Sequence, residues 1–154
     1  IEVSDFGCSH CQTFHQETLP ILKSQYVDNG DVRLIFLPYA LRAETTPSAE
    51  AAMCANEQDN KYYEFSQAMF EQETAFANSP DGIATAAETI DLDMDAFNEC
   101  LSDNRYDDII RKNQQVANAA DVKGTPTFFL NDAIIRGNVP LAEFQNQIEA
   151  ILGG

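Results

Sequence analysis

The chain has few basic residues and no long apolar run. Lys and Arg together number nine, against 25 Asp and Glu, so the formal net charge is -16. An acidic excess of this size argues against binding to nucleic acid or to anionic membrane surfaces, because both are negatively charged. No apolar stretch approaches the roughly 20 residues that a membrane-spanning helix requires, so we expect no membrane insertion.

The sequence also lacks a flexible linker, an internal repeat and a visible signal segment. With 154 residues and 44% hydrophobic residues, it suits a single domain with a proper core. It begins in the middle of an apolar stretch and not with Met, so we expect that something preceding Ile1 has been removed. Four cysteines, an even number, suit two disulfides and an oxidising compartment.

The most informative segment is Cys8-Ser9-His10-Cys11, which follows an apolar run and precedes a helical pattern. This position places the first sulfur at the opening turn of a helix, where free N–H groups and the helix dipole favour a thiolate. Cys11 lies three residues further on the same helix face and can close a disulfide with Cys8. The pair is typical of a reversible two-electron switch.

The reactivity of Cys8 depends on its thiol pKa, which three local groups should lower. They are the helix N-terminus, the backbone N–H of Cys11, and the imidazole of His10. A stabilised thiolate favours the reduced form, which makes the disulfide a stronger oxidant. The net negative charge opposes this effect, but charges more than about 8 Å apart are largely screened at physiological salt.

Metal binding is the alternative for the same segment. Cys8, Cys11 and His15 are spaced i, i+3 and i+7, so they share a helix face and could supply three ligands of a tetrahedral site. The fourth ligand would have to be Cys54, Cys100 or a distant acid. Structural zinc sites usually bring a second close pair of ligands, and this chain has none. The redox interpretation is favoured, with no metal and no cofactor expected.

Hydrophobic patterns predict a β-α-β unit, a helical segment, and then an α-β-β-α unit. Strands are expected at 1–6, 32–37, 127–131 and 133–137, and helices at 8–28 with a kink at Pro20, at 105–121 with Gly124 as its stop, and from 139 onward. Four more helices are expected between residues 39 and 104. The fold class is α/β: a four-stranded mixed sheet, a core of residues 1–38 and 105–154, and an inserted helical subdomain of residues 39–104. The cysteines then follow the C-terminal end of a central strand, the edge that ligand sites in such sheets favour.

Three features together resemble the DsbA-like family of thiol–disulfide oxidoreductases, which have the thioredoxin fold. They are the Cys8–Cys11 segment after a strand, the helical insertion, and Gly124-Thr125-Pro126-Thr127-Phe128-Phe129. The resemblance covers essentially the whole chain. It implies a cis bond between Thr125 and Pro126, beside Cys8, with the backbone of Thr125 available to pair with an extended substrate peptide.

The resemblance also implies roles for three residues outside that segment. Glu2 would be a buried acid beneath Cys11 that takes part in proton transfer. Cys54 and Cys100 would form a structural disulfide closing a loop of about 47 residues. The alternatives are that Glu2 is exposed and that the two cysteines are buried free thiols.

The function implied is oxidation of cysteines in secreted polypeptides. Cys8 would form the mixed disulfide, Cys11 would resolve it and His10 would stabilise the thiolate. A membrane quinone reductase of DsbB type would regenerate the disulfide, and the protein would be a periplasmic or otherwise extracytoplasmic monomer. A reductase or isomerase of the same fold is the second hypothesis.

The chain departs from the family pattern at three places. Ser9 stands where many relatives have proline, and His15 where several have an acid. The usual extra strand before the first one is missing, which would leave 32–37 as an exposed apolar edge.

Overall fold

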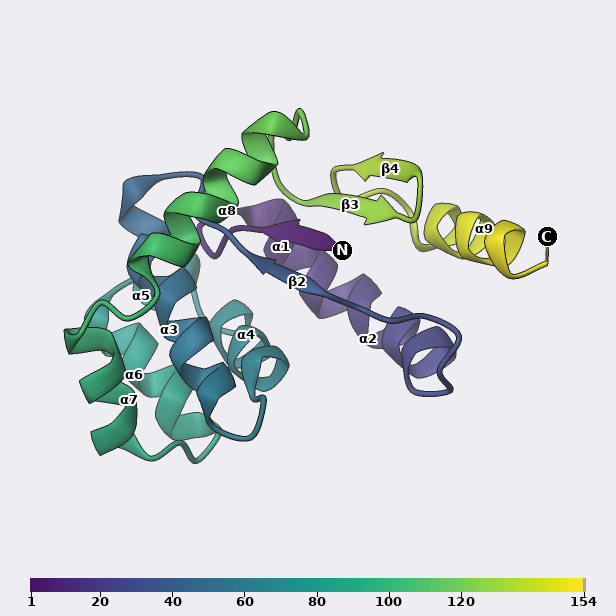
Figure 1. Ribbon diagram of the computed structural model, residues 1–154. Coiled ribbons are helices and arrows are strands. Elements are labelled where there is room, and N and C mark those ends of the chain that lie inside the picture. The colour runs from purple at the N-terminus through teal and green to yellow at the C-terminus, as the bar shows by residue number, and fades with distance from the viewer. Residues whose placement is uncertain (154) are drawn as a thin grey trace.

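The computed structural model describes residues 1–153. In these residues, four strands form one mixed sheet: β1 (Glu2–Ser4), β2 (Phe36–Pro38), β3 (Thr127–Leu130) and β4 (Ala133–Arg136). Their order in the sheet is β2-β1-β3-β4, with β1 parallel to β2 and antiparallel to β3. β3 and β4 form an antiparallel hairpin. β1 is therefore an interior strand, and the chain leaves its C-terminal end toward α1 (Ser9–Thr13) (Figure 1). The two cysteines follow that end of β1 along the chain, as the sequence predicts.

A long first helix follows β1 and covers one face of the sheet. It consists of α1 (Ser9–Thr13), a π-helical turn (Phe14–Thr18), α2 (Leu19–Leu22) and a second π-helical turn (Lys23–Val27). The helix passes through Pro20 because the first π turn lies just before it, where the N–H of Leu19 bonds to the carbonyl of Phe14. Proline has no N–H and crowds the carbonyl four residues before it, and a wider turn relieves that crowding.

Most of the remaining helices lie between β2 and β3. They are α3 (Thr46–Glu57), α4 (Tyr62–Phe70), α5 (Thr74–Ala77), α6 (Pro80–Thr89), α7 (Met94–Ser102) and α8 (Asp107–Ala119), preceded by a 3₁₀ turn at Ala43–Thr45. Several of them pack around one apolar cluster that includes Phe65, Met69 and Phe97. Phe6 and Cys11 belong to the same cluster, so these helices form part of the wall around the cysteine pair.

A second apolar cluster lies between the first helix, the sheet and the C-terminal helix α9 (Leu141–Leu152). The rings of Phe14 and Phe128 lie 4.5 Å apart at their centroids, and Phe144 of α9 packs on both. This cluster fixes the first helix on β3. It thereby holds the start of the helix, where the cysteines are, close to the segment before β3.

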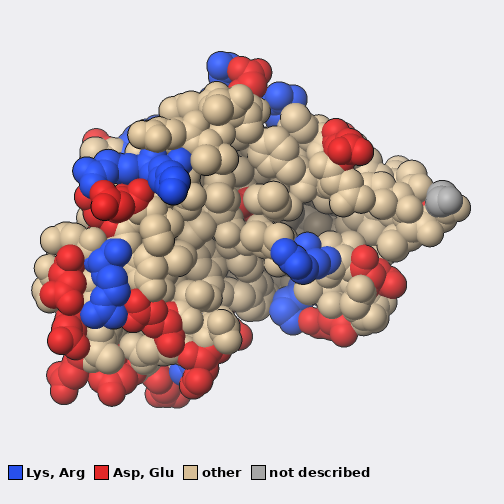
Figure 2. Space-filling view, in the orientation of Figure 1, with Lys and Arg blue, Asp and Glu red and all other residues tan. Residues whose placement is uncertain are grey.

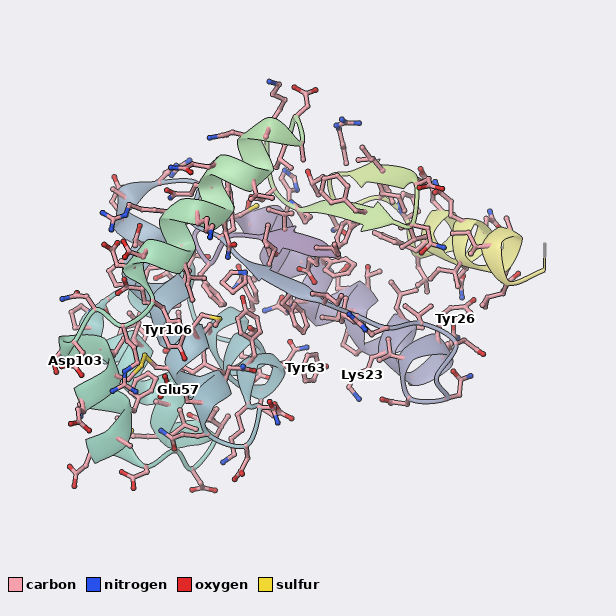
Figure 3. All side chains as sticks on the ribbon, viewed as in Figure 1. Lys23, Tyr26, Glu57, Tyr63, Asp103 and Tyr106 are labelled. Atoms are coloured by element: carbon pink, nitrogen blue, oxygen red, sulfur yellow. A yellow bond between two sulfur atoms is a disulfide. The ribbon has the colours of Figure 1, made fainter. Side chains whose placement is uncertain are left out.

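Helices α3 and α7 are joined by the Cys54–Cys100 disulfide, with the sulfurs 1.99 Å apart. Figure 3 shows the bond beside Glu57 and Tyr106. The Tyr106 hydroxyl and the guanidinium of Arg105 both donate to the Glu57 carboxylate, at 2.5 and 2.7 Å. These contacts add a polar cross-link between the end of α3 and the segment that leads into α8.

Three details of the predicted elements are wrong. Five helices, α3 to α7, lie between residues 39 and 104 where four are expected, because α5 is a separate short helix after α4. Of the strand expected at 32–37, only its last part pairs. The register sets Glu2 opposite Phe36, and the N–H of Glu2 bonds to the carbonyl of Ile35, so within the described chain residues 32–34 have no neighbouring strand. The residue that terminates α8 is Asp121, in the left-handed conformation (φ 57°), and not Gly124. The N–H groups of Asp121 and Val122 donate to the carbonyls of Asn118 and Ala117, respectively. The division into residues 1–38 with 105–154 and 39–104 stays a prediction.

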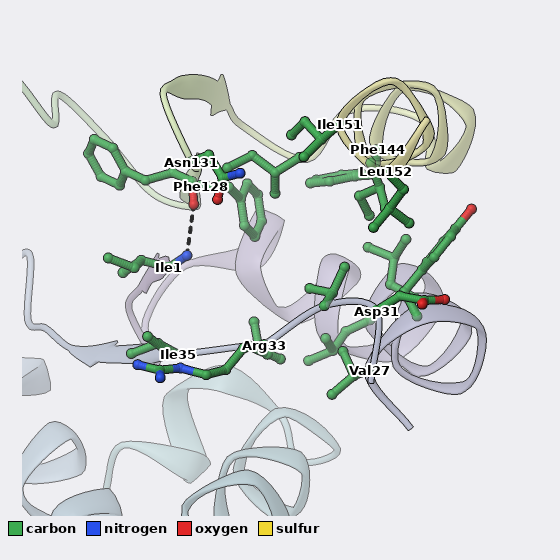
Figure 4. Close-up of a pocket in the computed structure, with 18 of the residues that line it drawn as sticks. Ile1, Val27, Asp31, Arg33, Ile35, Phe128, Asn131, Phe144, Ile151 and Leu152 are labelled. Carbon is green, nitrogen blue, oxygen red and sulfur yellow. Dashed lines mark hydrogen bonds between the residues drawn. The ribbon is translucent and has the colours of Figure 1, made fainter. Parts of the chain in front are cut away.

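An apolar cavity of about 390 Å³ lies away from the cysteines. Its walls come from α2, from residues 31–35 and from α9, and at one end the Ile1 ammonium donates to the Phe129 carbonyl at 2.8 Å (Figure 4). The residues that line it include neither Cys8 nor Cys11. The cavity is therefore separate from the redox pair.

The charge is distributed unevenly over the surface. Asp and Glu gather on the outer side of α6 and α7, whereas the middle of the same view is largely uncharged (Figure 2). Within the described residues, no helix is long and apolar enough to cross a bilayer.

Candidate redox site

Cys8 occupies the position immediately before the first turn of α1. Its backbone is extended (φ -99°, ψ 115°), and its sulfur accepts the N–H of Cys11 at 3.4 Å. A side chain in this position takes up an N–H that the first turn of a helix leaves free. Cys8 therefore lies at the N-terminus of α1, the position that the sequence predicts.

The local contacts lower the pKa of the Cys8 thiol to about 5. The largest contribution is the hydrogen bond from the Cys11 side chain, and contact with Thr125 and the backbone N–H groups of Cys11 and His10 add to it. Partial burial opposes the shift, since it disfavours the charged form. At neutral pH the Cys8 sulfur is then a thiolate, the species that reacts with disulfides.

Cys11 is the opposite of Cys8 in both exposure and acidity. Its side chain is 0% exposed, and burial raises the pKa of its thiol strongly, with the neighbouring Cys8 sulfur adding to the rise. The Ser4 side chain and the backbone near Asp5 oppose this rise only in part. Both sulfurs are free thiols in this structure. The pair therefore combines one reactive anion with one protected, protonated thiol.

The segment before β3 lies against Cys8, 117 positions away along the chain. The Thr125–Pro126 peptide bond is cis, and the Cys8 thiol lies 3.3 Å from the Thr125 carbonyl oxygen. Pro126 is buried, whereas Thr125 is partly exposed. The two residues that the resemblance assigns to substrate binding thus lie beside the reactive sulfur.

His10 contributes to the site through its backbone. Its N–H helps to lower the pKa of Cys8, and its side chain is exposed. Among residues 1–153 no hydrogen bond joins the His10 imidazole to a sulfur. The sequence argument for an effect of the imidazole therefore stays a prediction.

Asp5 shapes the loop between β1 and α1, which sequence reasoning did not anticipate. Its buried carboxylate accepts the N–H groups of Gly7 and Leu41, at 2.7 and 2.6 Å, and the hydroxyl of Thr45 at 2.6 Å. Its carbonyl accepts the N–H of Cys8 at 3.0 Å. Asp5 therefore fixes the start of α1 to the segment that follows β2. An acid two residues before Gly7-Cys8 was the only signal in the sequence.

Glu2 is buried, 1% exposed, and lies on β1 beneath the first helix. Its carboxylate is 2.8 Å from Nε2 of His15, which is also 1% exposed. The metal alternative needs His15 as a ligand together with Cys8 and Cys11. In the structure, Nε2 of His15 is instead paired with the Glu2 carboxylate. In the described part of the chain, no three His, Cys, Asp or Glu side chains are grouped as metal ligands.

Comparison with known families agrees with this geometry. A family model described as thioredoxin matches residues 1–150. The chain belongs to this thioredoxin family. Its membership covers both the sheet that carries the cysteines and the helices between β2 and β3.

Individual relatives are more distant. Disulfide bond formation protein D of Bacillus subtilis is 21% identical over 160 residues, covering 100% of this chain and 72% of that protein. The Na(+)/H(+) antiporter NhaA 3 of Salinispora tropica is 32% identical over 139 residues, but the match spans 85% of this chain and only 20% of the antiporter. The crystal structure of the thiol-disulfide exchange protein α-DsbA2 from Wolbachia pipientis superposes with a TM-score of 0.85 at 22% identity, covering 97% of this chain and 79% of that one.

These comparisons confirm the predicted resemblance and the predicted fold class. The chain has a thioredoxin-like fold, with a four-stranded mixed sheet flanked by helices, and it matches solved DsbA structures. The names of the relatives agree with the oxidoreductase that the sequence predicts.

Proposed function

We propose that this protein is a thiol–disulfide oxidoreductase that donates its Cys8–Cys11 disulfide to reduced polypeptides outside the cytoplasm. The observation that carries the proposal is the contrast between the two thiols: the pKa of Cys8 is lowered to about 5, whereas that of buried Cys11 is raised. A thiolate that is stable at neutral pH stabilises the reduced pair, which makes the disulfide a good oxidant.

The reaction follows from the exposure of the two sulfurs. A substrate thiolate attacks Cys8 in the oxidised protein, the Cys8–Cys11 bond breaks, and Cys11 leaves with the electron pair and takes up a proton. A second substrate thiolate then attacks the substrate sulfur of the mixed disulfide and expels Cys8 as a thiolate. Two electrons pass from the substrate dithiol to the cysteine pair, and the substrate gains a disulfide.

Thr125 and Pro126 are the proposed substrate-positioning residues. The Thr125 carbonyl lies 3.3 Å from the Cys8 thiol, so a peptide that pairs with this backbone segment would bring its own sulfur to Cys8. Backbone pairing of this kind binds many sequences, because it uses groups that every peptide carries. We propose reduced or unfolded polypeptides as substrates for that reason.

Regeneration requires an external oxidant, since each turnover leaves the pair reduced. We propose a membrane quinone reductase of DsbB type, whose disulfide Cys8 would attack and whose mixed disulfide Cys11 would resolve. A periplasmic or otherwise extracytoplasmic location and a monomeric state belong to the same proposal. The names of the disulfide bond formation proteins among the relatives support the oxidising direction.

The proposal is tested by a redox titration in glutathione buffers, combined with oxidation of a reduced peptide that contains two cysteines. We expect a potential clearly less negative than the roughly -270 mV of thioredoxin, and stoichiometric formation of the peptide disulfide. The Cys54→Ala/Cys100→Ala variant is the control and should oxidise the peptide as the wild type does. A potential near that of thioredoxin would instead favour the reductase or isomerase hypothesis.

A further inference from the structure

The main chain of Asp5 reaches both cysteines of the redox pair. Its carbonyl accepts the N–H of Cys8 at 3.0 Å, at the start of α1. Burial raises the pKa of the Cys11 thiol, and the Asp5 N–H lies near enough to that sulfur to oppose part of the rise. A displacement of Asp5 would therefore change a contact of each cysteine.

The Asp5 side chain holds this main chain in place through three hydrogen bonds. Oδ1 accepts the N–H of Gly7 at 2.7 Å, and Oδ2 accepts the N–H of Leu41 and the hydroxyl of Thr45, both at 2.6 Å. The residue is only 3% exposed. Hydrogen bonds to a carboxylate are about twice as strong as those between neutral groups, so the three together fix the side chain firmly.

The segments that receive the loop between β1 and α1 are themselves held in the fold. Leu41 and Thr45 lie between β2 and α3, and α3 is joined to α7 by the structural disulfide. On another side of the loop, the Phe6 carbonyl accepts the side-chain amide of Asn78, just after α5, at 2.9 Å. The loop that carries Asp5 is thus anchored to two segments outside the first helix.

Gly7 shows how closely this loop approaches its anchor. A Cβ added at Gly7 would lie 2.8 Å from Cγ2 of Thr45 and 3.1 Å from Oδ1 of Asp5. The backbone of Gly7 is not in the left-handed region, so the lack of space, and not the backbone conformation, favours glycine here. The packing therefore limits how far the loop can move toward Thr45.

We propose that Asp5 is a positioning residue for both sulfurs: its carboxylate, held by Leu41 and Thr45, aligns its carbonyl with Cys8 and its N–H with Cys11. The proposal rests on the proposed function and adds a component to it. When a substrate thiolate attacks Cys8, the S–S bond breaks and its electron pair goes to Cys11, where the aligned N–H stabilises the developing negative charge. The bond to the carbonyl keeps Cys8 at the first turn of α1, where its thiolate is stabilised.

The test replaces Asp5 with asparagine, which has nearly the same shape but a single acceptor oxygen. Because backbone N–H groups bond to both carboxylate oxygens, one of them would face the amide N–H₂ of Asp5→Asn. The thiolate absorbance of Cys8, with its midpoint near pH 5 in the wild type, should shift upward by about one pH unit, the effect of one weakened hydrogen bond to a charged group. The rate at which a small thiol reduces the Cys8–Cys11 disulfide, expressed per thiolate, should fall about tenfold for the same reason.

A second set of variants disturbs the same contact without changing the carboxylate. Gly7→Ala places a methyl group against Thr45 and should slow the reduction about tenfold, as overpacking displaces the loop. Thr45→Ser keeps the hydroxyl that bonds to Asp5 but removes Cγ2. The double variant Gly7→Ala/Thr45→Ser should therefore regain a large part of the lost rate, and a double variant as slow as Gly7→Ala would contradict the proposal. This set decides the question if Asp5→Asn does not fold.

The control separates positioning from a general loss of stability. Tyr26→Phe removes the hydrogen bond to Glu149, 3.0 Å long, at the far end of the first helix (Figure 3). It should retain the wild-type midpoint and rate, whatever stability it loses in a urea titration. If Asp5→Asn is destabilised but also retains both, Asp5 is only a structural residue, and the oxidoreductase proposal still stands. If the wild type does not oxidise the peptide, the proposed function itself fails.

Discussion

Changing Cys11 to alanine should stop the reaction at the mixed disulfide between Cys8 and the peptide. Reduced Cys11→Ala retains the Cys8 sulfur, which will attack a peptide disulfide, but it lacks the thiol that would release the peptide again. We expect a one-to-one mixed disulfide on Cys8, visible by intact mass under non-reducing conditions. Wild-type protein should show at most a trace of this species, because Cys11 lies within bonding reach and resolves it.

The matching variant is Cys8→Ser. Cys11 is fully buried and its thiol pKa is raised, so at neutral pH it offers neither access nor a thiolate. Peptide adducts and disulfide transfer should therefore fall at least about 1,000-fold, a loss set by the small thiolate fraction of a buried thiol. A Cys8→Ser protein that still forms adducts rapidly would reverse the roles assigned to the two sulfurs.

Removing the Cys54–Cys100 disulfide should lower the stability of the fold substantially, without loss of redox activity. The two cysteines are 46 positions apart, and closing a loop of this length stabilises the folded state by about 4 kcal/mol in the chain-entropy model. The free energy of unfolding of Cys54→Ala/Cys100→Ala, measured by urea titration against the wild type, should fall by roughly that amount.

The control for this experiment is Cys8→Ala/Cys11→Ala. It is compared with wild-type protein in which Cys8 and Cys11 are reduced and the Cys54–Cys100 disulfide is intact. It removes the same number of sulfurs but no covalent cross-link, since both of these cysteines are free thiols in the structure. Its unfolding free energy should change much less. If both double variants lose the same stability, the effect comes from lost packing in the shared apolar cluster, which contains Cys11, Cys54 and Cys100, and not from the disulfide.

The local parts of the fold could be predicted from the sequence because they depend on nearby residues. The hydrophobic stripe of the first helix and the hairpin at 127–136 follow from spacing alone, and the position of Cys8 follows from the junction between strand and helix. The extent of β2 could not be predicted, since a stretch such as 32–34 becomes a strand only where another strand lies beside it. The cap at Asp121 was missed because glycine is the usual residue there.

The parts of the site that escaped prediction depend on contacts between distant residues. Asp5 meets Leu41 and Thr45, which are 36 and 40 positions away, and neither partner is marked by a pattern. His15 looked like a possible metal ligand because helix geometry places it on the face of Cys8 and Cys11. Only the packing of the helix on β1 reveals that its ring faces Glu2.

The most direct test of the account is a titration of Cys8 in the reduced protein, followed by the ultraviolet absorbance of the thiolate. We predict that the absorbance rises with a midpoint near pH 5, and that Cys8→Ser shows no thiolate in this range. The same shift makes the thiolate stabilise the folded reduced protein. That contribution is complete above the ordinary pKa of 9.0 and is lost as the pH falls through about 5. A midpoint near 9.0 would contradict the account, because the helix start and the Cys11 thiol would then not hold Cys8 as an anion.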